Sequence, residues 1–268
     1  MTDKYVVFGN PVEHSMSPKI HSVFAKQTKQ DLIYDKILIP LGQFNTYADN
    51  FFKEGGLGCN ITVPFKLDAY AYADKLSDYA KAAGAVNTLK KLEDGSIYGD
   101  NTDGRGLVFD LLRLNCKLKG SKILIIGAGG AAKGILKPIL EQEPCSLTIV
   151  NRTLSKAQEL AALYQGVKAA SFEDLFDRFD VIINATSLSL TDELPNISDE
   201  LLAKASFVYD LMYRPNGQTV FTQKAKSLGV NHAYDGFGML IGQALLSFEL
   251  WRGVKADFQA TLDQFRTC

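Results

Sequence analysis

Cysteine and histidine are scarce in this chain, and their scarcity argues against two kinds of protein. The 268 residues include four cysteines, at positions 59, 116, 145 and 268, and three histidines. The cysteines are widely separated and form no CxxC pair, so the sequence has neither the spacing of a zinc site nor the framework of a disulfide-rich domain. We therefore expect free thiols in a reducing cytoplasm and no bound metal.

An excess of one charge and long apolar runs are also missing. The formal net charge is −1, which favours neither a nucleic acid nor an acidic membrane as partner. The apolar stretch 123–132 is too short and too rich in glycine to span a bilayer, and the N-terminus lacks the pattern of a signal peptide. With 46% hydrophobic and 22% charged residues, the composition is typical of a soluble globular enzyme and not of a disordered or fibrous chain.

The most informative stretch is 122–140, where an apolar run, a glycine-rich turn and a helical pattern follow one another. We expect a strand over 122–126 and a helix over 131–140. The pattern Gly127-x-Gly129-x-x-Ala132 between them fits a dinucleotide-binding turn, in which the pyrophosphate lies at the helix N-terminus. The alternative is a glycine-rich turn in some other α/β protein.

The next predicted strand, 146–150, indicates which dinucleotide is bound. NAD sites usually place an acidic residue after this strand, to hold the ribose 2′-hydroxyl. Here Arg152 stands there, with Lys156 one turn further on. A guanidinium group can bind a 2′-phosphate with two hydrogen bonds, so we expect NADP, with a solvated arginine as the alternative. A helix over 154–164 and strands over 181–185 and 207–210 extend a parallel, wound sheet.

The first hundred residues predict a second ligand site. A strand over 4–8 leads into a polar loop with Ser15 and Ser17, followed by a helix over 18–27 that Ser17 is expected to cap. Hydroxyl groups before a helix N-terminus can bind a carboxylate or a hydroxyl group. Helix capping alone would explain Ser17 in part but leaves Ser15 unexplained.

A strand over 59–63 places Asn60 and Thr62 on one face, and Lys66 follows in the first turn of the helix that begins at Pro64. One strand over 32–40 and one helix over 44–53 are expected between these two motifs. Because three polar groups converge at one strand end, we favour a functional Lys66 over a surface lysine.

Three more polar positions lie at element ends or on an apolar helix. Asn87 joins a helix to a strand that begins a hairpin, and the run 99–104 opens a helix over 105–114. Helix capping would account for one or two of the four polar residues in that run. Gln243 shares a face with Met239 on the apolar helix ending at 251, and its amide needs a partner there. The last helix is expected over 256–265.

Together these motifs resemble the shikimate/quinate dehydrogenase family over the whole chain. They are Ser15-Met-Ser17-Pro18, Asn60-Ile-Thr62-Val-Pro-Phe-Lys66, Gly84-Ala-Val-Asn87-Thr88, Gly99-Asp-Asn-Thr-Asp103-Gly104, Gly127-Ala-Gly-Gly-Ala-Ala132, Asn151-Arg-Thr153 and Asp235-Gly-Phe-Gly-Met239-Leu-Ile-Gly-Gln243-Ala.

The resemblance implies an α/β protein of two domains, with an active-site cleft between them. The α/β substrate domain would comprise 1–101 and 237–268, and the Rossmann-type NADP domain 102–236. The implied reaction is the NADP-dependent reduction of 3-dehydroshikimate to shikimate in aromatic amino acid biosynthesis, in the cytoplasm, by a monomer or homodimer.

The resemblance also implies a role for each site residue. Lys66 and Asp103 would form the catalytic acid/base pair. Seven residues would hold the substrate: Ser15, Ser17, Asn60, Thr62, Asn87, Tyr213 and Gln243. The cofactor residues would be Asp78, Gly127, Ala128, Gly129, Gly130, Ala131, Asn151, Arg152, Thr153, Lys156, Thr186, Met212, Gly236 and Met239.

The chain departs from the family pattern in two places. Asn184-Ala-Thr186-Ser187 is followed by Leu188-Ser189-Leu190 instead of x-Gly-Met, and Lys156 stands where the family has a second arginine. Two alternatives also stay open. One is a quinate/shikimate dehydrogenase of dual specificity, and the other is a non-enzymatic NADP-binding protein, which would need no proton donor.

Overall fold

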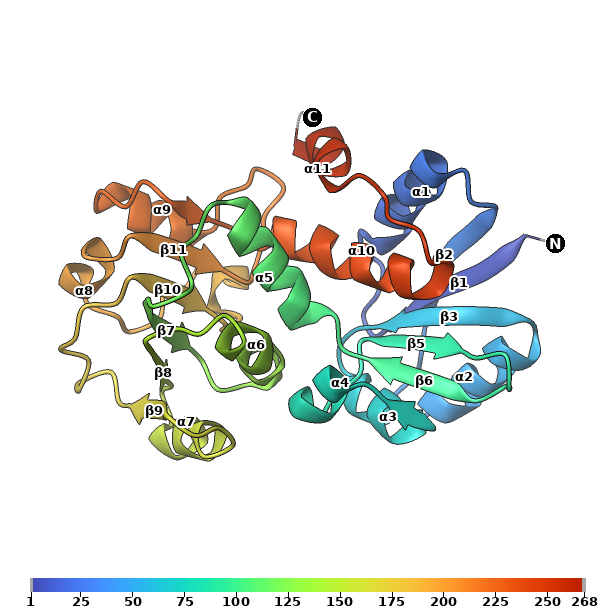
Figure 1. Ribbon diagram of the computed structural model, residues 1–268, viewed down its shortest axis with the longest axis horizontal. Coiled ribbons are helices and arrows are strands. Elements are labelled where there is room, and N and C mark those ends of the chain that lie inside the picture. Colours follow the sequence, from blue (N-terminus) through green and yellow to red (C-terminus); the bar gives the residue numbers. More distant parts are fainter. Residues whose placement is uncertain (1, 267–268) are drawn as a thin grey trace. The chain divides into compact units, whose positions relative to one another are not determined.

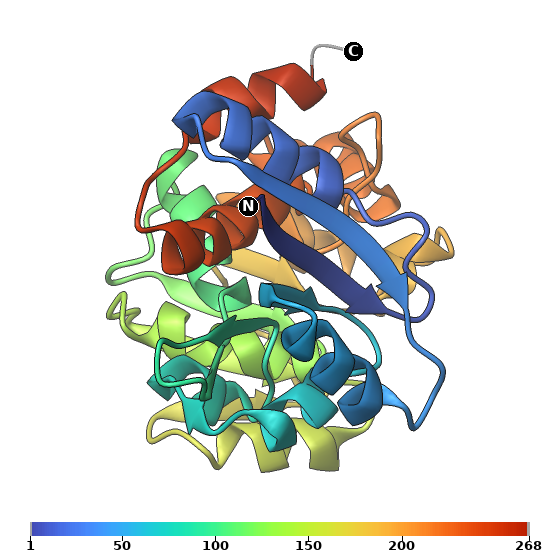
Figure 2. The same cartoon turned by 90° about the vertical axis from the view of Figure 1, so that its right-hand side faces the viewer.

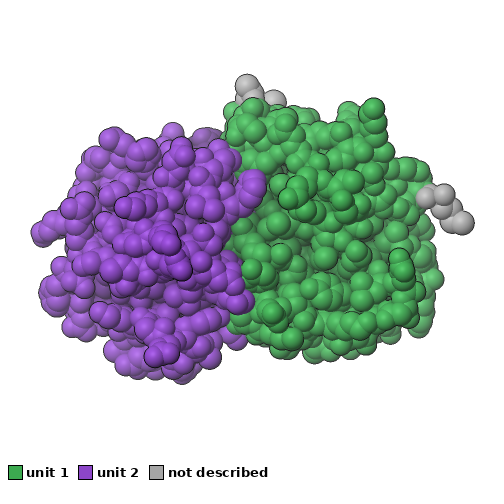
Figure 3. Space-filling view, viewed as in Figure 1, with its two compact units in different colours: residues 1–106, 241–268 green, residues 107–240 purple. Residues whose placement is uncertain are grey.

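The computed structural model describes residues 2–266 and divides the chain into two compact units (Figures 1 and 3). The first unit comprises residues 1–106 and 241–268, and the second comprises residues 107–240. Both boundaries fall inside helices, α5 (Asp103–Arg113) and α10 (Phe237–Arg252). The boundaries expected from the sequence, after residues 101 and 236, lie at or just before the starts of these two helices.

The second unit is built on a six-stranded parallel sheet with the order β12-β11-β10-β7-β8-β9. Its strands are β7 (Lys122–Ile126), β8 (Ser146–Val150), β9 (Val167–Ala170), β10 (Val181–Asn184), β11 (Phe207–Asp210) and β12 (Ala233–Tyr234). The helices are α6 (Gly130–Leu140), α7 (Leu154–Ala161), α8 (Asp199–Ala203) and α9 (Val220–Ser227), with a 3-10 turn at Leu188–Leu190. This is the strand order of a dinucleotide-binding sheet: strands β7 to β9 extend the sheet to one side, and the chain then crosses back, so that β10 to β12 extend it to the other side of β7.

Strand β7 shows why this sheet is buried on both faces. Ile123 and Ile125 belong to one hydrophobic core, whereas Leu124 and Ile126 belong to another. Because successive side chains point to opposite faces of a strand, a continuous apolar run buries both faces under helices. The sequence therefore specifies a central parallel strand.

The first unit contains a mixed six-stranded sheet with the order β2-β1-β3-β5-β6-β4. Its strands are β1 (Asp3–Gly9), β2 (Leu32–Leu38), β3 (Gly56–Ile61), β4 (Lys75–Leu76), β5 (Thr88–Lys91) and β6 (Ile97–Asp100). The helices are α1 (Ser17–Thr28), α2 (Phe44–Lys53), α3 (Lys66–Tyr72), α4 (Asp78–Ala83) and α11 (Phe258–Arg266). Helix α11 lies beside α1 (Figure 2), where Gln27 Nε2 donates to Thr261 Oγ1 over 3.1 Å.

The expected α/β class with a Rossmann-type NADP domain is confirmed. Two local predictions are wrong: Met16, not Ser17, is the N-cap of α1, whose first residue is Ser17, and α3 begins at Lys66, with Pro64 in the turn before it. The Ser15 hydroxyl instead accepts a hydrogen bond from the Ser17 N–H over 3.3 Å. Cys59, Cys116 and Cys145 are free, and Cys268 lies outside the described residues. Among residues 2–266 no helix has the length and apolar character of a membrane span, and no cluster suits a metal.

Candidate active site

Lys66 and Asp103 form an ion pair in the first unit. Lys66 Nζ lies 2.6 Å from Asp103 Oδ2, and the two side chains are 32% and 21% exposed. Each residue begins a helix, Lys66 in α3 and Asp103 in α5. The pair is therefore held at two element ends, accessible enough to meet a ligand and near enough to share a proton.

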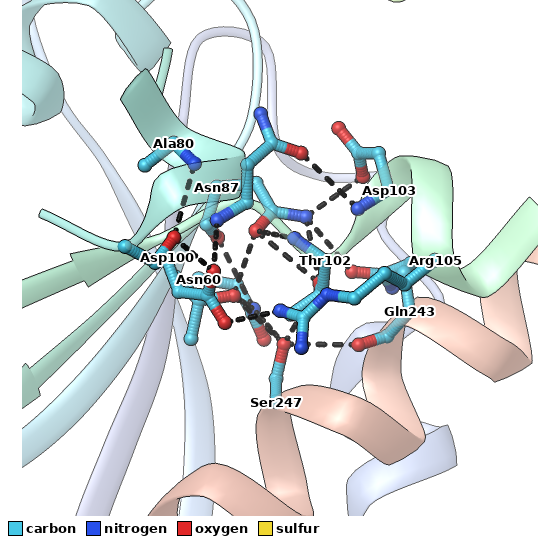
Figure 4. A network of polar contacts seen from close by, with 12 residues as sticks. Asn60, Ala80, Asn87, Asp100, Thr102, Asp103, Arg105, Gln243 and Ser247 are labelled. Carbon is cyan, nitrogen blue, oxygen red and sulfur yellow. Dashed lines mark hydrogen bonds and ion pairs between the residues drawn. The ribbon is translucent and has the colours of Figure 1, made fainter. Parts of the chain in front are cut away.

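Asn87 orients the carboxylate of this pair, as Figure 4 shows. Its amide nitrogen donates to Asp103 Oδ1 over 2.7 Å and to Thr102 Oγ1 over 2.9 Å. Its amide oxygen accepts from the Thr102 N–H over 2.9 Å and from Thr88 Oγ1 over 2.8 Å. One carboxylate oxygen of Asp103 thus faces the ammonium group and the other faces a buried amide.

Asn60 continues the network deeper into the unit. It is 5% exposed, and its amide nitrogen lies 3.0 Å from Ser247 Oγ and 3.1 Å from Thr88 Oγ1. Its amide oxygen accepts from the Tyr34 hydroxyl over 2.7 Å. Burial raises the pKa of Tyr34 well above its ordinary value, so Tyr34 remains a neutral donor.

Gln243 reaches this network because α5 and α10 approach closely at two glycines. A Cβ atom on Gly106 would lie 2.5 Å from the backbone nitrogen of Gln243, and one on Gly242 would lie 2.8 Å from the Gly106 carbonyl oxygen. No larger residue fits at this crossing without moving a helix. The Gln243 amide oxygen lies 3.5 Å from Asn87 Nδ2, so the predicted partner is a neighbouring site residue.

Ser15 and Thr62 belong to the loops that follow β1 and β3 in the same unit, and Ser17 is the first residue of α1, directly after the first of these loops. Ser17 is buried, whereas Ser15 and Thr62 are half-buried. The Thr62 N–H donates to the Phe8 carbonyl over 2.9 Å, which fixes the end of β3 against β1. The loops therefore present their hydroxyl groups from one end of the parallel strands.

Two predicted site residues lie in a different unit from the other residues predicted to bind the same ligand. They are Tyr213 of the substrate residues and Asp78 of the cofactor residues. Tyr213 belongs to the second unit, where its ring centroid lies 5.6 Å from that of Phe237 and burial raises its pKa. Asp78 belongs to the first unit, where it is exposed at the start of α4 and lies 3.6 Å from Lys81.

The glycine-rich turn follows β7 in the second unit. Gly127 has a φ of +109°, and a Cβ there would lie 3.1 Å from the Thr186 side chain. Around Gly129 and Gly130 the space is open, and α6 begins at Gly130 with no side chain capping it. Ala128 is half-buried and Ala131 is exposed. The uncapped N–H groups and the open space suit a pyrophosphate.

The segment after β8 carries the predicted phosphate site. Arg152, Thr153 and Lys156 are exposed, and Asn151 is half-buried with its amide nitrogen 2.9 Å from the Thr153 carbonyl oxygen. No acidic residue stands among positions 151–156. A guanidinium and an ammonium group on one exposed turn suit a 2′-phosphate and leave nothing to repel it.

Of the remaining cofactor residues, Thr186 and Met212 follow β10 and β11, Gly236 follows β12, and Met239 lies in the first turn of α10. Thr186 Oγ1 donates to Asn184 Oδ1 over 2.7 Å. The Gly236 N–H donates to the Met212 carbonyl over 2.9 Å, and the Met239 N–H donates to the Tyr209 hydroxyl over 3.1 Å. These are the strand ends where open α/β sheets place their ligands.

The sequence interpretation missed several buried polar residues of both sites. In the first unit they are Tyr34, Thr88 and Ser247, and in the second unit they are Ser189 and Asp210. Ser247 was open to detection, since it follows Gln243 by four residues and shares its helix face. Thr88 directly follows Asn87 in a quoted motif, and Ser189 lies in the departure at 188–190, whereas the sequence positions of Tyr34 and Asp210 carry no such signal.

Three family models match this chain. They are described as a shikimate dehydrogenase substrate binding domain over residues 7–89, shikimate / quinate 5-dehydrogenase over residues 110–200, and a shikimate 5'-dehydrogenase C-terminal domain over residues 236–264.

Relatives and solved structures match over nearly the full length. A protein of Vibrio cholerae named shikimate dehydrogenase (NADP(+)) is 54% identical over 267 residues, which cover 98% of this chain and 96% of the relative. The crystal structure of an Ael1 enzyme from Pseudomonas putida has a TM-score of 0.94 and 40% identity, covering 98% of each chain. Shikimate 5-dehydrogenase from Thermus thermophilus, solved with NADP(H) and shikimate, has a TM-score of 0.89 and 30% identity, covering 99% of each chain.

Proposed function

The chain belongs to the shikimate dehydrogenase family, and we propose that it catalyses the reversible, NADP-dependent reduction of 3-dehydroshikimate to shikimate in aromatic amino acid biosynthesis. One observation carries the proposal of activity: Lys66 Nζ and Asp103 Oδ2 lie 2.6 Å apart in the unit that holds the predicted substrate residues. A protein that only bound NADP would have no use for such a proton donor.

Lys66 serves as the acid and base of the reaction. As an ammonium group it donates a proton to the oxygen that becomes the C3 hydroxyl of shikimate, and as a neutral amine it accepts that proton in reverse. Asp103 holds the Lys66 ammonium group through one carboxylate oxygen, while Asn87 fixes the other. A carboxylate held at both oxygens keeps Lys66 in line with the substrate.

The second unit supplies the cofactor site. When bound, NADPH provides the hydride that reduces the C3 carbonyl. The turn Gly127–Ala131 and the N-terminus of α6 would hold the pyrophosphate, and Asn151, Arg152, Thr153 and Lys156 the 2′-phosphate. Thr186, Met212, Gly236 and Met239 would border the cofactor from the strand ends, and Asp78 would line the cofactor side from the first unit.

Substrate binding falls mainly to the first unit. Ser15, Ser17 and Thr62 offer hydroxyl groups, and Asn60, Asn87 and Gln243 offer amides. Tyr213 would complete the set. With the boundaries predicted from the sequence, residues 1–101 and 237–268 would bind mainly substrate and residues 102–236 mainly NADP, the exceptions being Asp78 and Met239 on the cofactor side and Tyr213 on the substrate side.

Quinate is a second candidate substrate, since the model that matches residues 110–200 is described for shikimate and quinate alike. The deciding experiment follows absorbance at 340 nm with shikimate or quinate, each paired with NADP⁺ or NAD⁺. We expect the highest kcat/KM with shikimate and NADP⁺. Comparable values for both acids would establish dual specificity, and NADP⁺ binding without turnover of either acid would refute the proposed activity.

We also propose that the protein works in the cytoplasm, which suits the free thiols Cys59, Cys116 and Cys145. A monomer or homodimer is the expected assembly. Light scattering of the purified protein distinguishes the two.

A further inference from the structure

The second unit buries a carboxylate that the proposed mechanism does not use. Asp210, the last residue of β11, is 0% exposed. Its Oδ2 accepts from Ser189 Oγ and from Thr219 Oγ1, each over 2.6 Å. Its Oδ1 accepts from the Met212 N–H over 3.1 Å and from Asn184 Nδ2 over 3.2 Å. Burial raises the pKa of Asp210, and the hydrogen bonds from Ser189, Thr219 and Met212 partly oppose this shift. A buried carboxyl group needs such donors, because leaving it without partners is costly.

Three of these four donors come from the two segments that hold predicted cofactor residues, and the fourth, Thr219, is the N-cap of α9. Asn184 ends β10, and its amide oxygen accepts from both the N–H and the hydroxyl of Thr186, over 3.1 Å and 2.7 Å. Met212 is itself a predicted cofactor residue and donates to Asp210 directly. Because β10 and β11 are neighbours in the sheet (Figure 1), one carboxylate fixes both segments where they leave it.

Ser189 adds a bond that a glycine at this position cannot make. It is the middle residue of the 3-10 turn Leu188–Leu190, where the family pattern has x-Gly-Met, and its side chain is fully buried. On the other side of this turn, Arg214 Nη2 donates to the carbonyl oxygens of Ser189 and Leu190 over 2.8 Å and 3.0 Å. The turn is thus held from inside by a hydroxyl group and from outside by a guanidinium group.

We propose that Ser189 and Asp210 are positioning residues for the cofactor. The Ser189 hydroxyl fastens the 188–190 turn to the Asp210 carboxylate, and the carboxylate sets the backbone at Thr186 and Met212. This inference rests on the proposed function, because it takes these two residues to border NADP. The contact contributes to dinucleotide affinity and leaves the proton transfer at Lys66 untouched.

The test compares NADPH binding by the full-length protein and its Ser189→Ala and Ser189→Gly variants, measured from nucleotide fluorescence without turnover. Loss of one hydrogen bond should raise the Kd for NADPH about three- to tenfold. The KM for shikimate should change less than about twofold, because six of the seven predicted substrate residues, all but Tyr213, lie in the first unit. Ser171→Ala is the matched control. It removes a serine hydroxyl that donates to Asp174 Oδ2 over 2.8 Å in the same unit, and it should leave the Kd unchanged.

A double-mutant cycle separates positioning from general stability. Asp210→Asn keeps the size of the side chain but removes the charged acceptor that Ser189 and Thr219 share, so Ser189→Ala should raise the Kd less in Asp210→Asn than in the parent. Unchanged NADPH binding by both Ser189 variants, or a lower Tm with an unchanged Kd, would overturn the inference. Should the parent bind NADPH and fail to oxidise shikimate, the proposed function would fall, while the binding comparison would still decide the role of Ser189.

Discussion

Acidification should destabilise the first unit through one buried imidazole. His21 on α1 has no exposed surface, and its ring stacks on Tyr34 with centroids 4.2 Å apart and an interplanar angle of 4°. Neither ring nitrogen makes a hydrogen bond to a residue between positions 2 and 266. Burial lowers the pKa of His21 to about 3, with the Asn60 side chain opposing part of the shift, from an ordinary value of 6.5.

The sign of the effect follows from proton uptake. Below pH 6.5 the unfolded chain binds a proton that the folded chain does not bind until about pH 3. The free energy of unfolding therefore falls as the pH drops through this window. Each pH unit costs about 1.4 kcal/mol, so the His21 contribution at pH 5 is about 2 kcal/mol below its value at pH 8.

Trp251 provides a local probe, because it is the single tryptophan and its ring lies 5.3 Å from that of His21. Urea titrations of its fluorescence from pH 8 to pH 5 would compare the parent with His21→Phe, which keeps a planar ring but binds no proton. The stability difference between them should shift by about 2 kcal/mol over this range, while His14→Gln, at an exposed site, follows the parent. A difference that stays constant would refute the neutral, buried imidazole.

Four further predictions concern the two sites. Lys66→Ala should lower kcat by about 10²–10⁴-fold with little change in NADPH binding, whereas Lys75→Ala, which removes an exposed ion pair, should leave steady-state rates unchanged. Arg152→Ala should raise the KM for NADP⁺ roughly 10- to 100-fold and spare that for NAD⁺; equal effects on both would contradict a 2′-phosphate site. Asn87→Ala should lower kcat by about tenfold or more, because Asp103 loses a charge-assisted bond. Gly106→Ala should cost about 1–3 kcal/mol in urea unfolding, and an unchanged midpoint would argue against the close crossing of α5 and α10.

The long periodic elements could be predicted because their residues encode them locally. The strand β7 and helix α6 follow from an apolar run, a turn and a small-residue pattern within twenty positions. The short strands β4 and β12 have two residues each, too few for any period to appear. They exist because neighbouring strands offer hydrogen-bonding edges, which is tertiary information.

The pairing of side chains was harder to predict than the residues themselves. Lys66 and Asp103 stand out as motif residues, and the fold brings them together across 37 positions. Asn60 also stands out in its motif, but it meets Ser247 across 187 positions, and nothing in the sequence indicates that these two pair. Ser17 was wrongly predicted as the N-cap because a serine before a proline favours that position. In the structure α1 begins at Ser17, one residue before the predicted start, and the Ser17 N–H donates to the Ser15 hydroxyl.

The hydrogen-bonding capacity of Asn87 limits what it can do in catalysis. An asparagine amide has two donor hydrogens and two acceptor lone pairs. The four shortest contacts of the Asn87 amide join its hydrogens to Thr102 Oγ1 and Asp103 Oδ1 and its oxygen to the Thr102 N–H and to Thr88 Oγ1, while Gln243 Oε1 lies farther from the amide nitrogen, at 3.5 Å. A substrate hydroxyl can therefore bind Asn87 only by displacing one of these partners. Since the bond to Asp103 involves a charged acceptor and is the shortest of the four, Asn87 acts chiefly through the carboxylate that holds Lys66.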